Sequence, residues 1–213
     1  MKYICVEGCI GVGKTTVATQ LSKAISGSVN LLEDFSSHPF LDDFYADEKY
    51  TFETEMNFIL IHYHQLIKAM ASDPQLLIGD YFFDRDKLFA DANILSETEM
   101  SIFMQLYDYL RTRIVRPDVI VCLSGTTDMI CERIATRNRE AEKNISYEYI
   151  DKINMYYEKF FSECRKSYHT IDVDMNTSDF IKSPSLINGL TEHICSTIAI
   201  SKNYKGNHIR PVR

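Results

Sequence analysis

Residues 8–15, with the sequence GCIGVGKT, combine residue types and a spacing that suit phosphate binding. They fit the pattern G-x-x-x-x-G-K-S/T in full, in which glycines let successive backbone N–H groups approach phosphate oxygens. Lys14 would reach the β and γ phosphates of a nucleotide, and the Thr15 hydroxyl would face Mg²⁺. Three of the eight glycines of the chain lie in this loop, namely Gly8, Gly11 and Gly13. The sequence therefore predicts a nucleotide phosphate site.

A second segment with phosphate chemistry is RIATRNREAEKN at residues 133–144. Arg133 and Arg137 are four residues apart and would share one helix face, while Arg139 would lie near the helix end. Planar guanidinium groups suit the charge that develops on a transferred phosphoryl group. The alternative interpretation of such a stretch is a solvated charge run. Because a phosphate loop is present as well, we favour an arginine lid.

The elements that would position these residues alternate between short apolar strands and longer amphipathic helices. Strands are expected at residues 2–6, 29–32, 76–78, 119–123 and 170–173, and helices at 14–26, 50–71, 98–114, 127–137, 146–165 and 183–200. Pro39 marks an irregular start to the segment PFLDDFY. This alternation predicts an α/β fold with a mostly parallel sheet covered on both faces. We expect one domain over residues 1–200 and a basic, solvated tail over 201–213.

Composition narrows the class of protein further. The 213 residues carry a formal net charge of −7, which argues against a partner that requires a basic face, such as a nucleic acid. The longest uninterrupted apolar run, residues 119–123, is far too short for a membrane span. The six cysteines form no C-x-x-C pair and lie partly in apolar runs, which indicates reduced core thiols. We therefore expect a cytoplasmic protein without a membrane or nucleic-acid partner.

Four segments, in this order, resemble the deoxyribonucleoside kinases, which phosphorylate the 5′-hydroxyl of a nucleoside with ATP. They are EGCIGVGKTT, Glu33 six residues before Pro39 in a segment like E…NPFL..FY, then GDYFFD, and RIATRNREAE. The resemblance runs from about residue 3 to 182, and FETEM and GDY are most similar to the bacterial deoxyguanosine kinases. It implies a P-loop kinase-type three-layer fold with a five-stranded parallel sheet and an arginine lid. It also implies ATP and Mg²⁺ as co-substrate and cofactor, and a homodimer.

The resemblance assigns roles to individual residues. Glu33 would be the general base for the 5′-hydroxyl, with its neighbour Asp34 as the alternative. Asp80 would hold Mg²⁺ together with Thr15. Tyr45 and Glu142 match the pair that binds the sugar 3′-hydroxyl. The remaining implied positions are Lys14 and Arg133 in catalysis, Thr16, Arg137, Arg139, Asp179 and Phe180 around ATP, and Phe44 beside the deoxynucleoside.

Two departures from the family pattern affect the acceptor site. Asp80-Tyr81-Phe82 stands where the family usually has Asp-Arg-Ser or Glu-Arg-Ser, so the arginine near the general base is missing. Arg85 is a candidate replacement. His62 stands where the family has an arginine, seven residues after the expected base reader Glu55. Both would lie on one helix face.

Glu55 stands where most of the family has Gln, and this change bears on the nucleobase. A carboxylate only accepts hydrogen bonds, and guanine presents two adjacent donors, its ring N–H and its amino group. Adenine and cytosine each present an acceptor beside a donor, which leaves a lone pair facing the carboxylate at a cost of ~1–3 kcal/mol. Glu55 thus favours deoxyguanosine. Phe89 is the candidate stacking ring. Counting back along the family pattern from Phe89 gives Arg85 as the residue that contacts the base, whereas counting forward from Asp80 gives Asp86.

Other functions remain as alternatives. Deoxyadenosine kinase or broad deoxynucleoside kinase activity is the nearest. A nucleoside monophosphate kinase such as thymidylate kinase would share the loop and lid, but its anionic acceptor suits a site with Glu33, Glu55 and Glu142 poorly. A GTPase-like switch is disfavoured because no N-K-x-D motif occurs in the chain.

Overall fold

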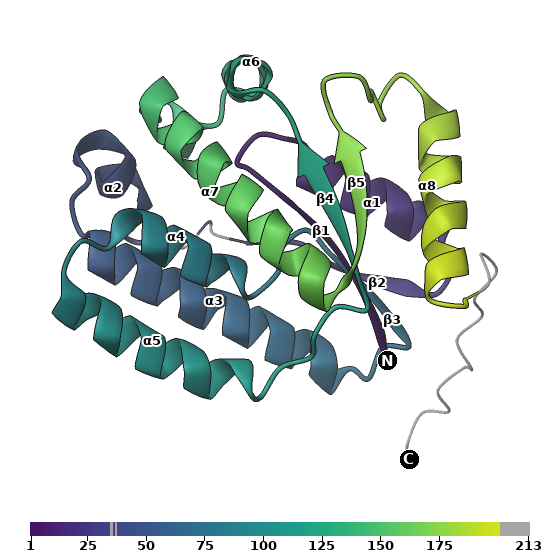
Figure 1. Cartoon of the computed structure of the whole chain (residues 1–213), viewed down its shortest axis with the longest axis horizontal. Coiled ribbons are helices and arrows are strands. Elements are labelled where there is room, and N and C mark those ends of the chain that lie inside the picture. The colour runs from purple at the N-terminus through teal and green to yellow at the C-terminus, as the bar shows by residue number, and fades with distance from the viewer. Residues whose placement is uncertain (35, 37, 201–213) are drawn as a thin grey trace.

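The computed structural model describes residues 1–34, 36 and 38–200, and within these ranges strands and helices alternate along most of the chain (Figure 1). The predicted basic tail, residues 201–213, lies outside the described residues. The strands are β1 (Lys2–Gly8), β2 (Ser28–Leu31), β3 (Leu76–Gly79), β4 (Val119–Ser124) and β5 (His169–Asp174). The helices are α1 (Lys14–Ala24), α2 (Leu41–Asp47), α3 (Thr51–Ala71), α4 (Arg85–Asn93), α5 (Glu97–Arg111), α6 (Thr127–Arg137), the short 3₁₀ helix η1 (Glu140–Glu142), α7 (Tyr147–Ser167) and α8 (Pro184–Thr197).

The five strands form one parallel sheet in the order β2-β3-β1-β4-β5. At its centre Cys5 of β1 is in register with Gly79 of β3 and Ile120 of β4. All four residues of β3 and the last six of β1 are buried, so these strands are continuous runs of buried residues and lack an alternating pattern. The predicted α/β class and five-stranded parallel sheet are confirmed.

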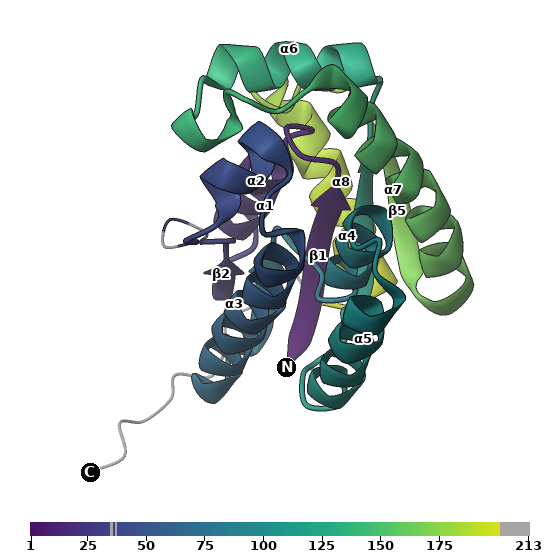
Figure 2. The same ribbon diagram turned by 90° about the vertical axis from the view of Figure 1, so that its left-hand side faces the viewer.

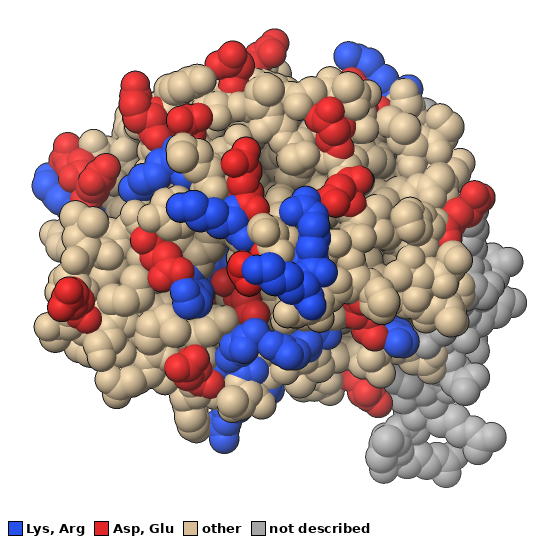
Figure 3. Space-filling view, in the orientation of Figure 1, with Lys and Arg blue, Asp and Glu red and all other residues tan. Residues whose placement is uncertain are grey.

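Helices cover both faces of this sheet (Figure 1). α1 and α8 pack together on one face, and α3, α4, α5 and α7 form the layer on the other. All six cysteines are free thiols, five of them buried. Among the described residues, no helix has the length and apolar character that a membrane crossing requires. In the space-filling view, Lys and Arg side chains in the middle of the visible face are interspersed with Asp and Glu (Figure 3).

Two helices differ from the prediction. The sequence predicts an irregular segment after Pro39, but Leu41–Asp47 forms helix α2, which buries Leu41 and Phe44. Helix α4 has no counterpart among the predicted elements because its buried face carries Arg85, Asp86 and Asn93 beside small apolar residues. A helix that turns charged side chains inward has no apolar periodicity for sequence analysis to detect.

The parallel strands all present their carboxyl ends at the same edge of the sheet, which lies near α2 and α6 (Figure 2). The glycine loop follows β1, Glu33 follows β2, and Asp80 follows β3. Ligands of open α/β sheets bind in the crevice beyond these carboxyl ends. The topology therefore brings three separate predicted site segments to one edge.

Candidate active site

A cavity of about 450 Å³ opens at this edge of the sheet. Its walls come from the glycine loop, the β2–α2 connection, α2, α3, α4, the α6–η1 segment and α7. The predicted site residues that line it are Gly11, Gly13, Lys14, Thr15, Thr16, Glu33, Phe44, Tyr45, Glu55, His62, Asp80, Arg85, Asp86, Phe89, Arg137, Arg139 and Glu142. Four predicted residues, Gly8, Arg133, Asp179 and Phe180, do not contribute to its lining.

The glycine loop leads into an open helix start. Gly13 precedes α1 with a φ of +118° and provides no side-chain cap, whereas Ser96, Thr126 and Ser146 cap α5, α6 and α7 with their hydroxyls. The first N–H groups of α1 are thus left for an anion, which the helix dipole favours. At Gly11, with a φ of +82°, a Cβ would lie 2.5 Å from a side-chain carbon of Ile134. Only glycine fits both the backbone and the space there.

Lys14 folds back along this loop. Its Nζ donates to the backbone oxygens of Gly8, at 2.7 Å, and Cys9, at 3.1 Å. Burial lowers the pKa of Lys14, and the charge of Arg85 lowers it further, while Glu7 opposes the shift. The partners of this cation are neutral carbonyl groups. Phosphate oxygens would therefore compete for it with no carboxylate to displace.

Thr15 and Asp80 place oxygen atoms side by side beyond the loop. The Thr15 hydroxyl donates to Asp80 Oδ2 at 2.6 Å, and the backbone N–H of Glu33 donates to Asp80 Oδ1 at 2.7 Å. A hydroxyl and a carboxylate are the hard oxygen ligands that Mg²⁺ prefers, with nucleotide phosphates completing its shell. The pair therefore fits the metal implied by the sequence, and the bound ion would neutralise charge on the phosphates.

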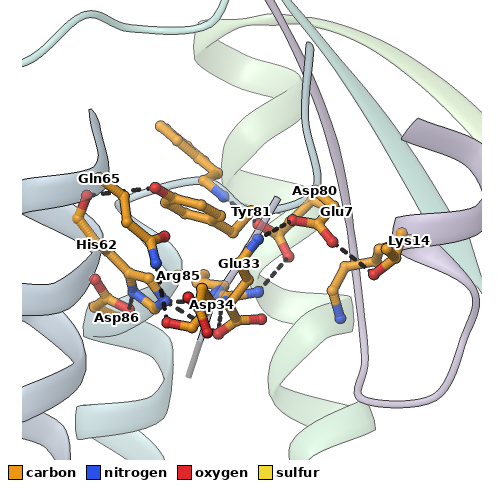
Figure 4. Close-up of polar contacts among 12 residues, drawn as sticks. Glu7, Lys14, Glu33, Asp34, His62, Gln65, Asp80, Tyr81, Arg85 and Asp86 are labelled. Carbon is orange, nitrogen blue, oxygen red and sulfur yellow. Dashed lines mark hydrogen bonds and ion pairs between the residues drawn. The ribbon is translucent and has the colours of Figure 1, made fainter. Parts of the chain in front are cut away.

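Glu33 is held by two cationic side chains (Figure 4). Its Oε1 accepts hydrogen bonds from Arg85 and, at 3.0 Å, from His62 Nε2. Burial alone would raise the pKa of Glu33, but the Arg85 charge and the His62 hydrogen bond outweigh it, so the pKa lies well below its usual range. The neighbouring Asp34 is exposed and accepts hydrogen bonds from Ser36. Of the two acids, Glu33 is the one the cavity surrounds with cations.

His62 bridges two carboxylates. Its Nδ1 lies 2.7 Å from Asp86 Oδ1, and its Nε2 lies 3.0 Å from Glu33 Oε1. A carboxylate accepts only, so hydrogen bonds to both acids require a proton on each ring nitrogen, which makes the imidazole a cation. The Arg85 guanidinium, whose Nη2 lies 3.2 Å from Nε2, opposes this charge. Burial opposes this charge, but Asp86 and the two hydrogen bonds raise the pKa of His62 to about 9. With 1% of its surface exposed, His62 is a buried ion between two acids.

Arg85 connects this network to an acid that sequence analysis missed, Glu7 of β1. Arg85 Nη1 lies 3.8 Å from Glu7 Oε1, and Glu7 has no exposed surface. The backbone N–H of Phe82 donates to Glu7 at 2.6 Å and the Tyr157 hydroxyl at 3.0 Å. Burial raises the pKa of Glu7 and Arg85 opposes the shift. An acid inside an otherwise apolar strand was the available signal, since such a charge must be paired.

The far end of the cavity contains Glu55, which is 2% exposed. Its Oε1 accepts a 2.8 Å hydrogen bond from the Asn93 amide, which also contacts the Tyr149 hydroxyl at 3.1 Å. Sequence analysis missed Asn93 and Tyr149 because neither belongs to a motif. Asp86 Oδ2 is buried without a hydrogen-bond partner in the described part of the chain. This end therefore presents acceptors to a ligand that carries N–H groups.

The predicted lid arginines have different partners. Arg137 Nη2 pairs with Glu142 at 2.5 Å, and Arg139 Nη1 lies 3.7 Å from the same carboxylate. Arg133 instead donates to the backbone oxygens of Val12, at 2.6 Å, and Met175, at 3.1 Å. It therefore braces the glycine loop from the side. In the β5–α8 connection, Phe180 is 5% exposed and Asp179 accepts from two nearby backbone N–H groups.

A phosphate loop at the carboxyl edge of a parallel sheet, joined to a buried polar pocket, defines a nucleotide-dependent phosphotransferase fold with a separate acceptor site. The family model for deoxynucleoside kinase matches residues 4–199, and the chain belongs to this family. It is 29% identical over 199 residues to deoxyguanosine kinase of Bacillus subtilis, which covers 90% of this chain and 95% of the relative. It is 28% identical to deoxyadenosine kinase of Dictyostelium discoideum over 86% of this chain and 76% of that protein.

The structure of deoxyadenosine kinase from M. mycoides with bound dATP has the same fold. The TM-score is 0.76 at 22% sequence identity, over 89% of this chain and 99% of that one. The resemblance found in the sequence is thus confirmed at the level of the family. The protein is a deoxynucleoside kinase that binds a deoxynucleoside and takes phosphate from ATP or another nucleoside triphosphate.

Proposed function

We propose that the protein transfers the γ-phosphoryl group of ATP, with Mg²⁺, to the 5′-hydroxyl of a purine deoxyribonucleoside, with deoxyguanosine as the preferred acceptor and dGMP as product. The observation that carries this proposal is Glu55, a buried carboxyl at the end of the cavity opposite the phosphate loop. Its hydrogen-bond partner is the Asn93 amide. A similar relative, from Bacillus subtilis, is named deoxyguanosine kinase.

The proposed reaction assigns the general base to Glu33. Its carboxylate accepts the proton of the 5′-hydroxyl as that oxygen attacks the γ-phosphorus. Arg85 and His62 hold the carboxylate in place and ionised before the substrate arrives. The loop N–H groups and Lys14 would bind the phosphates, with Arg133, Arg137 and Arg139 nearby. Asp179 and Phe180 stay a proposed contact with the adenine of ATP.

Tyr45 and Glu142 are the proposed contacts of the sugar 3′-hydroxyl. Both line the cavity, and Tyr45 packs on Tyr149 with ring centroids 6.0 Å apart. Burial raises the pKa of Tyr45, and the charges of Glu33 and Glu142 raise it further, so its hydroxyl stays a donor. A phenol beside a carboxylate offers one donor and one acceptor to a single sugar hydroxyl. Phe44 and Phe89 supply apolar walls.

Energetics favour guanine only by a modest margin. Burial raises the pKa of Glu55 to about 8, and its ionisation at pH 7 therefore costs about 1 kcal/mol. Two donors from guanine to the resulting carboxylate exceed this cost, since a hydrogen bond to a charged group contributes about 1.5–3 kcal/mol. Deoxyadenosine is the second candidate because the same raised pKa leaves Glu55 neutral in the empty site.

The direct test measures kcat/KM for the four deoxynucleosides with ATP and Mg²⁺. Deoxyguanosine should give the highest value, deoxyadenosine the next, and the two pyrimidines the lowest. Nucleoside monophosphates offered as acceptors should give no product, because they bring an anion to a site with Glu33, Glu55 and Glu142. A pyrimidine as best substrate would refute the purine assignment, and product from a monophosphate would point to the other class of kinase.

The proposal also includes a homodimer and a cytoplasmic location. The family resemblance implies the first, and the reduced thiols of the sequence favour the second. Sedimentation of the purified full chain tests the dimer directly. Fractionation of cells tests the location.

A further inference from the structure

The end of the cavity near Glu55, here called the base end, contains a pair of residues of which only Glu55 belongs to a segment that carries the family resemblance. Asn93 is 8% exposed on α4 and donates to Glu55 on α3 at 2.8 Å. This hydrogen bond uses one of the two lone pairs of Glu55 Oε1, so the other lone pair of Oε1 and both lone pairs of Oε2 remain for a ligand in the cavity that Glu55 lines. No cation lies within salt-bridge distance of Glu55 in the described part of the chain, in contrast to Glu33.

The surroundings of Glu55 give its charge little support. The charged and titratable groups that face it or its immediate neighbours are His62 on α3, Arg85 and Asp86 on α4, Tyr45 on α2, Tyr149 on α7, and, around Tyr45, Glu33 and Glu142. Burial raises the pKa of Glu55 most, and Asp86 raises it further. The Asn93 hydrogen bond and the two cations act in the other direction but do not cancel the effect of burial.

The two protonation states of this carboxyl present different hydrogen-bond patterns. An ionised carboxylate offers acceptors only, which match the adjacent ring N–H and amino group of guanine. A neutral carboxylic acid offers one donor and one acceptor, as an amide does. That pattern matches adenine, whose ring nitrogen accepts beside an amino group that donates. One side chain can therefore read either purine, depending on a single proton.

Resting on the proposed function, we propose that Asn93 and Glu55 form a specificity-determining pair in which the proton on Glu55 selects the purine: guanine when Glu55 is ionised, adenine when it is neutral. Asn93 sets the balance because its amide donates to the carboxylate and stabilises the ionised form. Asn93 is thus a positioning residue that acts through Glu55.

The experiment measures kcat/KM for deoxyguanosine and deoxyadenosine from about pH 6 to about pH 8.5. Steps common to both substrates cancel in the ratio of the two values. Two units below its pKa a carboxyl is only about 1% ionised, so the ratio of deoxyguanosine to deoxyadenosine should rise about tenfold or more over this range. Glu55→Gln should give a ratio that does not change with pH. Glu53→Gln, an exposed acid on the same helix, should keep the rise of the natural protein.

Asn93→Leu tests the second member of the pair. Loss of the amide donor removes a contact that favours the carboxylate, so the rise in the ratio should move to higher pH, with deoxyadenosine favoured at about pH 8. An unchanged midpoint in this variant would remove Asn93 from the proposal.

A readout without substrate guards against a folding defect. A carboxyl whose pKa is raised in the folded protein destabilises it as the pH rises from the unfolded pKa to the folded one. The stability of Glu55→Gln relative to the natural protein should therefore rise between about pH 5 and about pH 8, while that of Glu53→Gln should not change. A constant stability difference, or a ratio that stays flat while deoxyguanosine is phosphorylated, overturns the inference alone. If no purine deoxynucleoside is phosphorylated at any pH, the proposed function itself fails.

Discussion

The phosphate end and the base end of the cavity use different kinds of chemical groups. The phosphate end uses backbone groups of one continuous segment, residues 8–15, and a helix start without a side-chain cap. The base end uses buried and half-buried side chains from α2, α3, α4 and α7, which lie far apart in the sequence. Phosphate groups are the same in every nucleoside triphosphate, so fixed backbone donors suffice for them. Nucleobase edges differ, and only side chains can distinguish them.

The partners of the cations differ in the same way. At the phosphate end, Lys14 and Arg133 donate to neutral backbone oxygens. The two other arginines proposed for ATP, Arg137 and Arg139, pair with Glu142. Near the acceptor site, Arg85 and His62 bind carboxylates. A cation that donates to a carbonyl oxygen can exchange that hydrogen bond for one to a phosphate at low cost. A buried cation paired with a carboxylate cannot, because breaking the pair leaves a buried charge without a partner. The glycine loop thus has cations whose neutral partners a phosphate can replace. Near the acceptor site the cations are already paired with carboxylates, which suits a neutral acceptor.

Glu33 lies where the two ends meet, and its removal should have the largest effect. Glu33→Gln keeps the shape but removes the base, so kcat should fall by about 10²–10⁴-fold while ATP binding persists. Steady-state kinetics and direct ATP titration measure the two quantities. Asp34→Asn is the matched control, because Asp34 is exposed and bonds to Ser36. The assignment is wrong if Asp34→Asn loses turnover and Glu33→Gln retains it.

Lys14→Ala should damage the phosphate end alone. We expect kcat/KM for ATP to fall by about 10²–10³-fold, a typical loss for one preorganised donor to a transferred group. The ratio of deoxyguanosine to deoxyadenosine should stay that of the natural protein. Lys23→Ala, which removes an exposed lysine from the last turn of the same helix, controls for changes in α1. A shift of base preference in Lys14→Ala would contradict the separation of the two ends.

The geometry of the proposed phosphate end could be predicted almost completely from the sequence. Strand, glycine loop and helix follow one another within about 25 residues, so the local sequence alone determines how these three parts are arranged. The five strands were found for a similar reason, since a buried parallel strand is a short apolar run. Lys14, Thr15 and Asp80 could be assigned to this edge of the sheet because the segment that carries each of them follows a strand of this kind.

The base end could be predicted only in part. Helix α4 was not predicted because Arg85, Asp86 and Asn93 are on its buried side, so it lacks an apolar periodicity. Glu7 and Asn93 belong to no motif, and their importance comes from partners far away in the sequence, such as Tyr157 and Glu55. For the same reason the sequence left open whether Arg85 or Asp86 would contact the base. The structure shows both buried and both bonded to the network, Arg85 at Glu33 and Asp86 at His62.

Arg85→Met should test how far the stability of the protein depends on the cation in the buried network near the acceptor site. The substitution removes the ion-pair partner of the buried acid Glu7 and leaves it only the charge of Lys14, and loss of one partner of a buried ion pair costs about 3–5 kcal/mol. Urea unfolding measures the change. Arg111→Met is the matched control, because its pair with Asp84 is partly exposed and should contribute about 1 kcal/mol or less. Equal losses in the two variants would show that burial of the network does not matter.

The smallest expected effect concerns the proton on His62. Its pKa of about 9 in the folded protein lies above its unfolded value of about 6.5, so its stabilising contribution is complete below the unfolded pKa and disappears as the pH rises through about 9. The difference corresponds to about 3 kcal/mol. The stability gap between the natural protein and His62→Gln should therefore shrink by about this amount between about pH 6 and about pH 10 in urea unfolding. His64→Gln, an exposed neighbour on α3, should show no such change. A gap for His62→Gln that does not vary with pH would mean that the imidazole is neutral and can donate a hydrogen bond to only one of its two carboxylate partners.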